Sequence, residues 1–235
     1  MLSPHRGVLF LVVLLVTSSA ALAQSSRKAN RLARSVAQAH GLAAFDSIDE
    51  IRFTFNFGRG GRTSSRTWHW RPAQDAIRLQ EADAEPIAVV RGTLDESSPE
   101  ELRRTDAKFI NDRFWLMFPF HLAWDENLTF TVQDDVELPI GEGRARLLRV
   151  AYPDVGGYTP GDVYDVYLGD GHRILQWGFR RGGVESEARP ITWEAPVSFG
   201  PLELVLDHRS EGGARLWFSD VAVRFVGSDR WVEAE

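Results

Sequence analysis

The sequence predicts an α+β domain made mostly of antiparallel β-strands, with one helix near the N-terminus and a second in mid-sequence. Apolar residues recur at helical spacing over residues 29–40, and Gly41 can end this helix in a left-handed turn. From Ile51 onward the apolar residues recur at every second position, which is typical of half-buried strands. Helical spacing returns over residues 100–118, which predicts a central helix between strands.

The strand pattern is clearest at residues 51–57, where four apolar side chains alternate with three polar ones. A second strand carries Trp68 and Trp70 on one face, and a turn at residues 72–75 follows it. The glycines on either side of Asp170 predict a hairpin between two later strands. We expect further strands at residues 76–79, 144–151, 163–168, 174–179, 202–207 and 216–226.

The central helix follows Pro99, a residue that favours the first turn of a helix. Phe114 and Phe118 are spaced by four residues, as neighbours on one helix face are. Because Pro119 disfavours helical geometry in the residue before it, we expect the helix to end by Phe118. Apolar residues at 114–118 cover every side of this helix, which must therefore be buried all round or border an apolar cavity.

Residues 1–23 have the three-part layout of a cleavable signal peptide. Arg6 provides a charged opening, and the apolar run at 8–16 is shorter than the roughly 20 residues that span a membrane. Residues 21–23 match the small-x-small pattern that signal peptidase recognises. We therefore expect residues 24–235 to form a single domain that is periplasmic or secreted.

The absence of cysteine limits how the protein is stabilised and anchored. There is no cysteine for lipid attachment, disulfide formation or a thiolate metal site. We therefore expect a soluble protein without a stable membrane anchor. The formal net charge is −6 and the chain has no long basic run, which argues against nucleic acid or anionic lipid surfaces as partners.

Motifs for catalysis and cofactor binding are sparse. The sequence has no G-x-S-x-G elbow, no P-loop and no histidine pair at i, i+4, so we expect no cofactor and no locally encoded metal site. Asp106, Asn111 and Asp112 could supply oxygen ligands to calcium, but their spacing differs from that of a calcium loop. His121 could act in acid–base catalysis with Asp112 or Asp125, or it could be a hydrogen-bonded structural histidine.

Aromatic residues are unusually frequent, with eight Trp and fourteen Phe in the chain. Most of them can pack in one core. A sheet that holds an aromatic helix is also a natural container for an apolar ligand, so these residues are the candidates for ligand binding. The candidate cavity residues are Phe53, Phe55, Trp68, Trp70, Phe114, Trp115, Phe118, Phe120, Trp124 and Trp177. The polar candidates beside them are Asp112, His121 and Asp125.

Five segments carry a resemblance to a known family. They are FIND at 109–112, WLMFPFHLAWD at 115–125, ITW at 191–193, FGPL at 199–202 and LWFSDV at 216–221. Together with the N-terminal helix and the Phe-rich strand pair, these segments resemble the LolA/LolB-like superfamily of periplasmic lipoprotein carriers and receptors. The resemblance extends over most of residues 24–235.

The resemblance implies a strongly curved antiparallel half-barrel whose open side is covered by helices and whose cavity accepts acyl chains. The cavity arginine of the family's carrier has no assigned counterpart in this sequence. The lack of cysteine excludes the lipid-anchored receptor form.

Three functions are compatible with the sequence. The leading hypothesis is a soluble periplasmic carrier that binds a lipid, an acyl chain or a lipidated protein, without catalysis. The second is an exported enzyme that uses His121. The third is an envelope assembly or scaffold protein that offers a sheet edge or apolar patch to a partner. The sequence does not determine the oligomeric state.

Overall fold

The computed structural model describes residues 6–82, 84–156, 158 and 160–234. Of residues 6–22 it describes the backbone only. The predicted signal peptide covers residues 1–23. Residues 1–5 and the side chains of residues 6–22 lie outside the described part, so the signal peptide stays a prediction.

Two long α-helices occur in the described part of the chain. Helix α1 spans Arg6–Ala39 and helix α2 spans Glu100–Trp124. No helix in the described residues is both long enough and apolar enough to cross a membrane. Short 3₁₀ helices lie at Leu42–Ser47, Pro72–Gln74, Arg91–Thr93 and Asp170–His172.

The described strands form two antiparallel sheets, which we call the large sheet and the small sheet. The large sheet has the strand order β10-β11-β12-β1-β2-β3-β4, and β13 pairs with β12. Its strands are β1 (Ile48–Arg59), β2 (Arg62–Arg71), β3 (Ala76–Gln80), β4 (Ile87–Val90), β10 (Glu194–Phe199), β11 (Leu202–Arg209), β12 (Arg215–Phe225) and β13 (Trp231–Glu233).

The small sheet is a meander in which each strand pairs with the next along the chain. Its strands are β5 (Thr129–Glu137), β6 (Arg144–Ala151), β7 (Val163–Leu168), β8 (Ile174–Arg180) and β9 (Arg189–Thr192). Strands β7 and β8 form the hairpin that the glycines beside Asp170 predict. Only Trp193 separates β9 from β10, so the chain passes from the small sheet to the large one without a loop.

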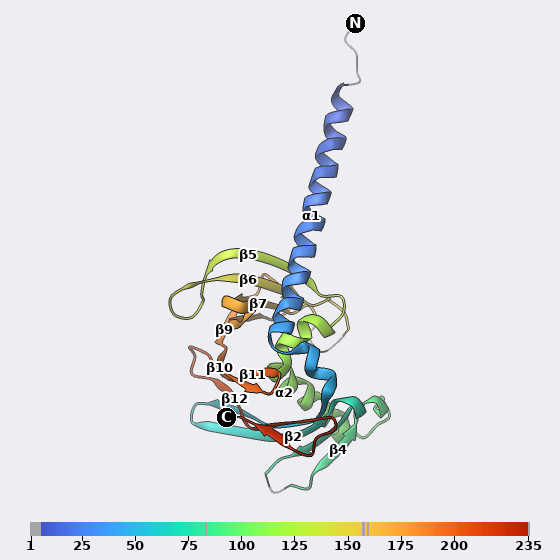
Figure 1. Ribbon diagram of the computed structural model, residues 1–235, viewed down its shortest axis with the longest axis vertical. Helices are drawn as coiled ribbons and strands as arrows, with labels where there is room; N and C mark the ends of the chain where they lie inside the picture. The colour runs from blue at the N-terminus through green and yellow to red at the C-terminus, as the bar shows by residue number, and fades with distance from the viewer. Residues whose placement is uncertain (1–5, 83, 157, 159, 235) are drawn as a thin grey trace.

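The two sheets lie on opposite sides of α2, with the large sheet at the bottom of Figure 1 and the small sheet at the top. The large sheet is built from both ends of the folded domain, because β1 pairs with β12. Helix α1 runs along the side of the body, and its N-terminal part projects beyond the small sheet (Figure 1). This arrangement brings α2 into contact with two separate cores.

Helix α1 packs through the stripe that the helical spacing predicts. Leu32 and Val36 are buried against α2 and the small sheet, together with Ala29 and Ala33. The helix ends at Ala39, and Gly41 has a φ of 96°, as expected for a left-handed turn. A Cβ at Gly41 would lie 2.3 Å from the carbonyl oxygen of Pro201, so a side chain there would clash with the backbone.

Helix α2 contributes side chains to both cores. Phe109, Leu116 and Phe120 pack against the large sheet, in what we call the large-sheet core. Phe118 and Leu122 pack against the small sheet and α1, in what we call the small-sheet core. A helix held between two sheets needs apolar residues on opposite faces, which explains why residues 114–118 are apolar all round.

The prediction that the central helix ends by Phe118 is wrong, because α2 continues through Pro119 to Trp124. Proline within a helix removes one backbone hydrogen bond and costs about 3 kcal/mol. Phe118 and Phe120, on either side of the proline, are both fully buried. Burying such side chains yields roughly 1.5–3 kcal/mol each, which outweighs the local cost of the proline.

The α+β class and the antiparallel strand arrangement agree with the sequence prediction, whereas the strong curvature of a half-barrel stays a prediction. The strands that the sequence analysis did not predict are β4, β5, β9, β10 and β13. They are short or mostly exposed, so their alternation of apolar and polar residues is weak.

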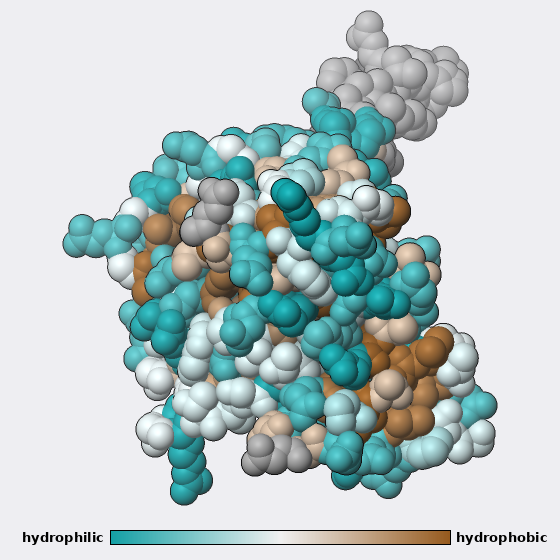
Figure 2. All heavy atoms as spheres, turned by 60° about the horizontal axis from the view of Figure 1, so that its bottom comes forward, coloured by the Kyte–Doolittle hydropathy of each residue, from teal (hydrophilic) through white to brown (hydrophobic). Residues whose placement is uncertain are grey.

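The surface that includes the outer side of the large sheet is mostly polar, with hydrophobic residues gathered toward one side (Figure 2). Among the described residues, the large apolar side chains with the greatest exposure are Val155, Val226 and Tyr158. Val90, on the edge strand β4, is half exposed.

Candidate ligand-binding pocket

An open pocket of about 900 Å³ lies beside α2, on the side of the small sheet. Helix α2 contributes one wall, and strands β7 and β8 contribute another. The described residues that line it include Arg91, Ile110, Arg113, Phe114, Trp115, His121, Trp124, Asp125, Glu126, Tyr152, Val155, Tyr158, Asp162, Tyr164, Trp177, Phe179 and Arg181. The pocket is large enough for a drug-sized or lipid-like molecule.

Aromatic rings form a continuous wall inside the pocket, which we call the aromatic wall: Phe114, Trp115, Tyr164, Trp177 and Phe179. The rings of Tyr164 and Trp177 stack with their centres 4.9 Å apart. Trp115 meets Trp177 edge-on at 4.6 Å, and Phe114 lies 5.4 Å from Tyr164. Such mutual packing holds the rings in place, so the wall is preformed for apolar contact.

A histidine–aspartate pair lies at one end of this wall. His121 Nδ1 lies 2.9 Å from a carboxylate oxygen of Asp125, and the Tyr152 hydroxyl donates to the other oxygen at 2.7 Å. Burial lowers the pKa of His121, and the bond to Asp125 offsets only part of this effect. Burial raises the pKa of Asp125, but the bonds from His121 and Tyr152 outweigh burial and leave that pKa below its usual range.

Because Nδ1 of the neutral imidazole donates its proton to Asp125, Nε2 is left as an acceptor. Nε2 is buried and has no hydrogen-bond partner among the described residues. His121 is only 5% exposed and lines the pocket. His121 therefore borders the pocket with an unused acceptor that is buried.

A half-buried arginine, Arg113, also borders the pocket. The guanidinium of Arg113 lies 5.3 Å from the ring centre of Trp70 and 5.7 Å from that of Phe109. Burial lowers the pKa of Arg113 to about 10, and the nearby positive charge of Arg91 acts in the same direction. Arg113 therefore still carries its charge at neutral pH.

Of the predicted cavity residues, the structure brings Phe114, Trp115, Trp124 and Trp177 together around the pocket. Trp177 is at the same time a fully buried member of the small-sheet core, and the remaining candidates lie in the two cores. Phe53, Phe55, Trp68, Trp70 and Phe120 lie in the large-sheet core, and Phe118 lies in the small-sheet core. Of the polar candidates, His121 and Asp125 line the pocket and Asp112 does not.

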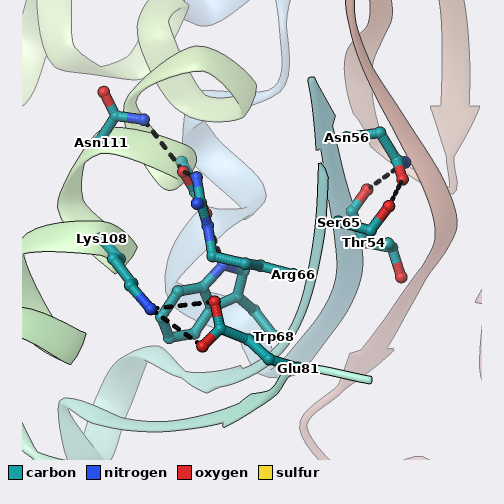
Figure 3. A network of polar contacts seen from close by, with 9 residues as sticks. Thr54, Asn56, Ser65, Arg66, Trp68, Glu81, Lys108 and Asn111 are labelled. Atoms are coloured by element: carbon teal, nitrogen blue, oxygen red, sulfur yellow. Dashed lines mark hydrogen bonds and ion pairs between the residues drawn. The ribbon is translucent and has the colours of Figure 1, made fainter. Parts of the chain in front are cut away.

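Asp112 instead ties α2 to strand β2. Arg66 donates to both of its carboxylate oxygens at 2.7 Å, and Trp68 Nε1 donates at 2.9 Å. Asn111 Nδ2 donates to the same carboxylate at 3.0 Å, and Figure 3 shows Arg66 and Trp68 on the strand side and Asn111 on the helix. Lys108, one turn earlier, pairs with Glu81 at 2.9 Å (Figure 3). Asp112 is fully buried with its hydrogen bonds made, which is the geometry of a structural link.

Several pocket residues were not predicted from the sequence: Arg113, Tyr152, Tyr164, Phe179 and Arg181. The one local signal was Arg113, a charged residue inside an otherwise aromatic segment. Within the described part of the chain, no cluster of three His, Asp or Glu residues could hold a metal ion. The residues considered as calcium ligands form ion pairs with different arginines: Asp106 pairs with Arg91, and Asp112 pairs with Arg66.

No protein-family model matches the chain, and no curated protein matches its sequence. Solved structures with a similar fold include a DUF1329 family protein from Desulfovibrio piger, with 11% identity and a TM-score of 0.48. They also include a domain from Vibrio parahaemolyticus described as an outer membrane lipoprotein-sorting protein, with 12% identity and a TM-score of 0.48. Each of these two alignments covers 87% of this chain and 95% of the other.

A third similar structure is the MucA/MucB complex of Pseudomonas aeruginosa, with 13% identity and a TM-score of 0.28. This alignment covers 86% of the present chain and 59% of the other.

Proposed function

We propose that this protein binds an apolar ligand, a lipid or acyl chain, in the pocket beside α2 and carries it through the periplasm. The observation that supports this proposal is the aromatic wall along one open pocket, in which the half-buried rings of Phe114, Trp115 and Phe179 are backed by the buried rings of Tyr164 and Trp177. An apolar chain laid on such a wall removes its own surface and that of the rings from water. The function is binding and transport without a chemical step.

The proposal includes the half-barrel curvature that the family resemblance implies. The direct passage from β9 to β10 through Trp193 supports it, because strands that continue from one sheet into another form the corners of bent sheets. It also includes export, with Gln24 as the mature N-terminus. Mass spectrometry of the protein from a periplasmic fraction tests the export step, and a mass that retains residues 1–23 contradicts it.

The test of ligand binding begins with the protein purified from its native envelope. Extraction with organic solvent and mass spectrometry should recover a lipid in near-stoichiometric amount. A co-purifying lipidated protein would identify the cargo as a lipoprotein instead. Recovery of neither, together with no calorimetric binding of dodecanol, contradicts the proposed function.

A matched pair of tryptophan variants locates the binding. Trp115→Ala removes a half-buried ring of the aromatic wall and should weaken dodecanol binding about tenfold, the effect of losing one large apolar contact. Trp217→Ala removes a half-buried ring from β12, which is not among the pocket residues, and should leave the affinity unchanged. Equal losses in both variants would mean that the pocket is not the binding site.

One observation favours a second function, that of an exported enzyme. The free acceptor Nε2 of His121, oriented by Asp125 and Tyr152, has the arrangement of a general base. Hydrolysis of a dodecanoyl ester by the wild-type protein, lost in His121→Gln while dodecanol still binds, would support an enzyme. A carrier instead shows no turnover in either protein.

A further inference from the structure

Arg113 is a half-buried arginine whose guanidinium lacks a carboxylate partner within the described residues. It forms no ion pair or hydrogen bond with any of them, and its Nε is buried without an acceptor. The guanidinium lies over the faces of Trp70 and Phe109, which attract a cation but accept no strong hydrogen bond. Buried charges in folded proteins are normally paired, because leaving water without a partner is costly.

The charged neighbours of Arg113 are already engaged with other groups. Asp106 and Asp75 form ion pairs with Arg91. Asp125 attracts Arg113 electrostatically, but its carboxylate accepts from His121 and Tyr152 and forms no ion pair with the guanidinium. A counter-ion for Arg113 must therefore come from outside the described residues, and the open pocket beside it is the route.

His121, which also lines the pocket, carries a second unpartnered polar atom. His121 is 5% exposed, and its Nε2 has no hydrogen-bond partner among the described residues. The ring of His121 contacts Phe114 of the aromatic wall, with centres 4.8 Å apart. Two unsatisfied polar groups therefore stand beside an apolar wall, which is the layout of a site for a molecule with a polar head and an apolar chain.

We propose that the pocket binds an anionic amphiphile whose carboxylate or phosphate pairs with Arg113, while its chain lies on the aromatic wall. The inference rests on the proposed function and adds the chemical class of the ligand. A guanidinium presents paired N–H donors that match the oxygens of either anion.

The experiment compares ligands that share one chain and differ in the head. Dodecanoate, dodecyl phosphate, dodecanol and inorganic phosphate are titrated into the purified protein at pH 8 by isothermal titration calorimetry. We expect one or both anionic amphiphiles to bind at least about tenfold more tightly than dodecanol, since hydrogen bonds to charged groups are the stronger ones. The tighter of the two identifies the head as a carboxylate or a phosphate.

Variants assign the preference to Arg113. Arg113→Gln should bind all three amphiphiles with the affinity of dodecanol, and Arg113→Lys should retain part of the preference because it keeps the charge. Arg78→Gln removes the same charge from an exposed position on β3 and should behave as the wild type. Thermal unfolding of each variant verifies the fold, and Arg113→Lys provides the test if Arg113→Gln does not fold.

The outcomes separate this inference from the proposed function. Equal affinities for dodecanol and both anions in the wild type overturn the anionic head and leave the apolar carrier standing. An undiminished preference in Arg113→Gln overturns the role of Arg113. Binding of inorganic phosphate through Arg113, without any binding of dodecanol, supports the anion site and overturns the apolar carrier.

Discussion

Asp112 and Arg113 are neighbours in α2, yet the carboxylate is paired within the protein and the guanidinium is not. The carboxylate of Asp112 points to the large sheet and receives hydrogen bonds from Arg66, Trp68 and Asn111. The guanidinium of Arg113 borders the pocket and is not paired with any described carboxylate. A buried charge with its partners in place links two elements of the fold, whereas a buried charge beside a pocket is available to a ligand.

The largest expected effect on stability comes from breaking the ion pair between Asp112 of α2 and Arg66 of β2. Arg66→Met leaves the carboxylate of Asp112 buried and without its guanidinium, which should lower the free energy of unfolding by about 4 kcal/mol. Urea denaturation measures this loss. Arg78→Met, at an exposed position of the adjacent strand, should change stability by less than about 0.5 kcal/mol. A loss below about 1 kcal/mol in Arg66→Met would mean that the link contributes little to stability.

The next effect compares two phenylalanines one turn apart on α2. Phe118 is fully buried in the small-sheet core, so Phe118→Ala should lower the free energy of unfolding by at least about 3 kcal/mol. Phe114 is only half-buried at the pocket, so Phe114→Ala should cost about 1 kcal/mol and weaken dodecanol binding. Urea denaturation and calorimetry measure the two properties. The comparison fails if Phe118→Ala is the variant that loses binding while it keeps its stability.

The pH dependence of stability tests a buried group outside the pocket. Burial lowers the pKa of His208 to about 4, below the value near 6.5 expected in the unfolded chain. The unfolded chain therefore binds more protons between pH 6.5 and 4, and stability falls as the pH decreases through this window. The contribution is on the order of 3 kcal/mol.

His208→Gln does not titrate, so its stability should depend less on pH between 6.5 and 4 than that of the wild type. The measurement is urea denaturation at several pH values. His172→Gln replaces a half-buried histidine in the turn before β8 and serves as the control substitution. Identical pH profiles for His208→Gln and the wild type would show that His208 is not held neutral by burial.

The sequence was informative where burial follows a regular period, and it was not where partners come from distant segments. The helical spacing of Leu32 and Val36 predicted α1, and the alternation of Trp68 and Trp70 predicted β2, because each element buries one face. Pro119 misled the prediction, because its local penalty is smaller than the burial of the residues beside it. Tertiary packing of this kind leaves no signal in the few residues around the proline.

The residues of the candidate site also divide into some that the sequence could predict and others that it could not. Phe114 and Trp115 could be predicted as pocket residues, because an aromatic segment that is apolar all round is unusual in a polar chain. Phe53 and Phe55 have the same chemistry but fill the large-sheet core, and no local pattern separates the two groups. Arg113 and Tyr152 could not be recognised as pocket residues from the local sequence. They come together only because α2 lies beside the end of β6, about forty residues later in the chain.

The smallest expected effect on stability is the most specific test of the comparison between Arg113, which has no described carboxylate partner, and Arg66, which pairs with Asp112. Arg113→Met removes a desolvated charge and also two cation–π contacts of about 0.5–1 kcal/mol each, so the stability of the ligand-free protein should change by no more than about 1 kcal/mol. The same substitution at Arg66 should cost several times more, because only there does it leave a buried carboxylate unpaired. Thermal unfolding with and without dodecanoate completes the test, since a ligand raises the unfolding temperature only of a protein that binds it. Equal losses of stability at the two positions would mean that Arg113, like Arg66, belongs to the structural framework and is not held available for a ligand.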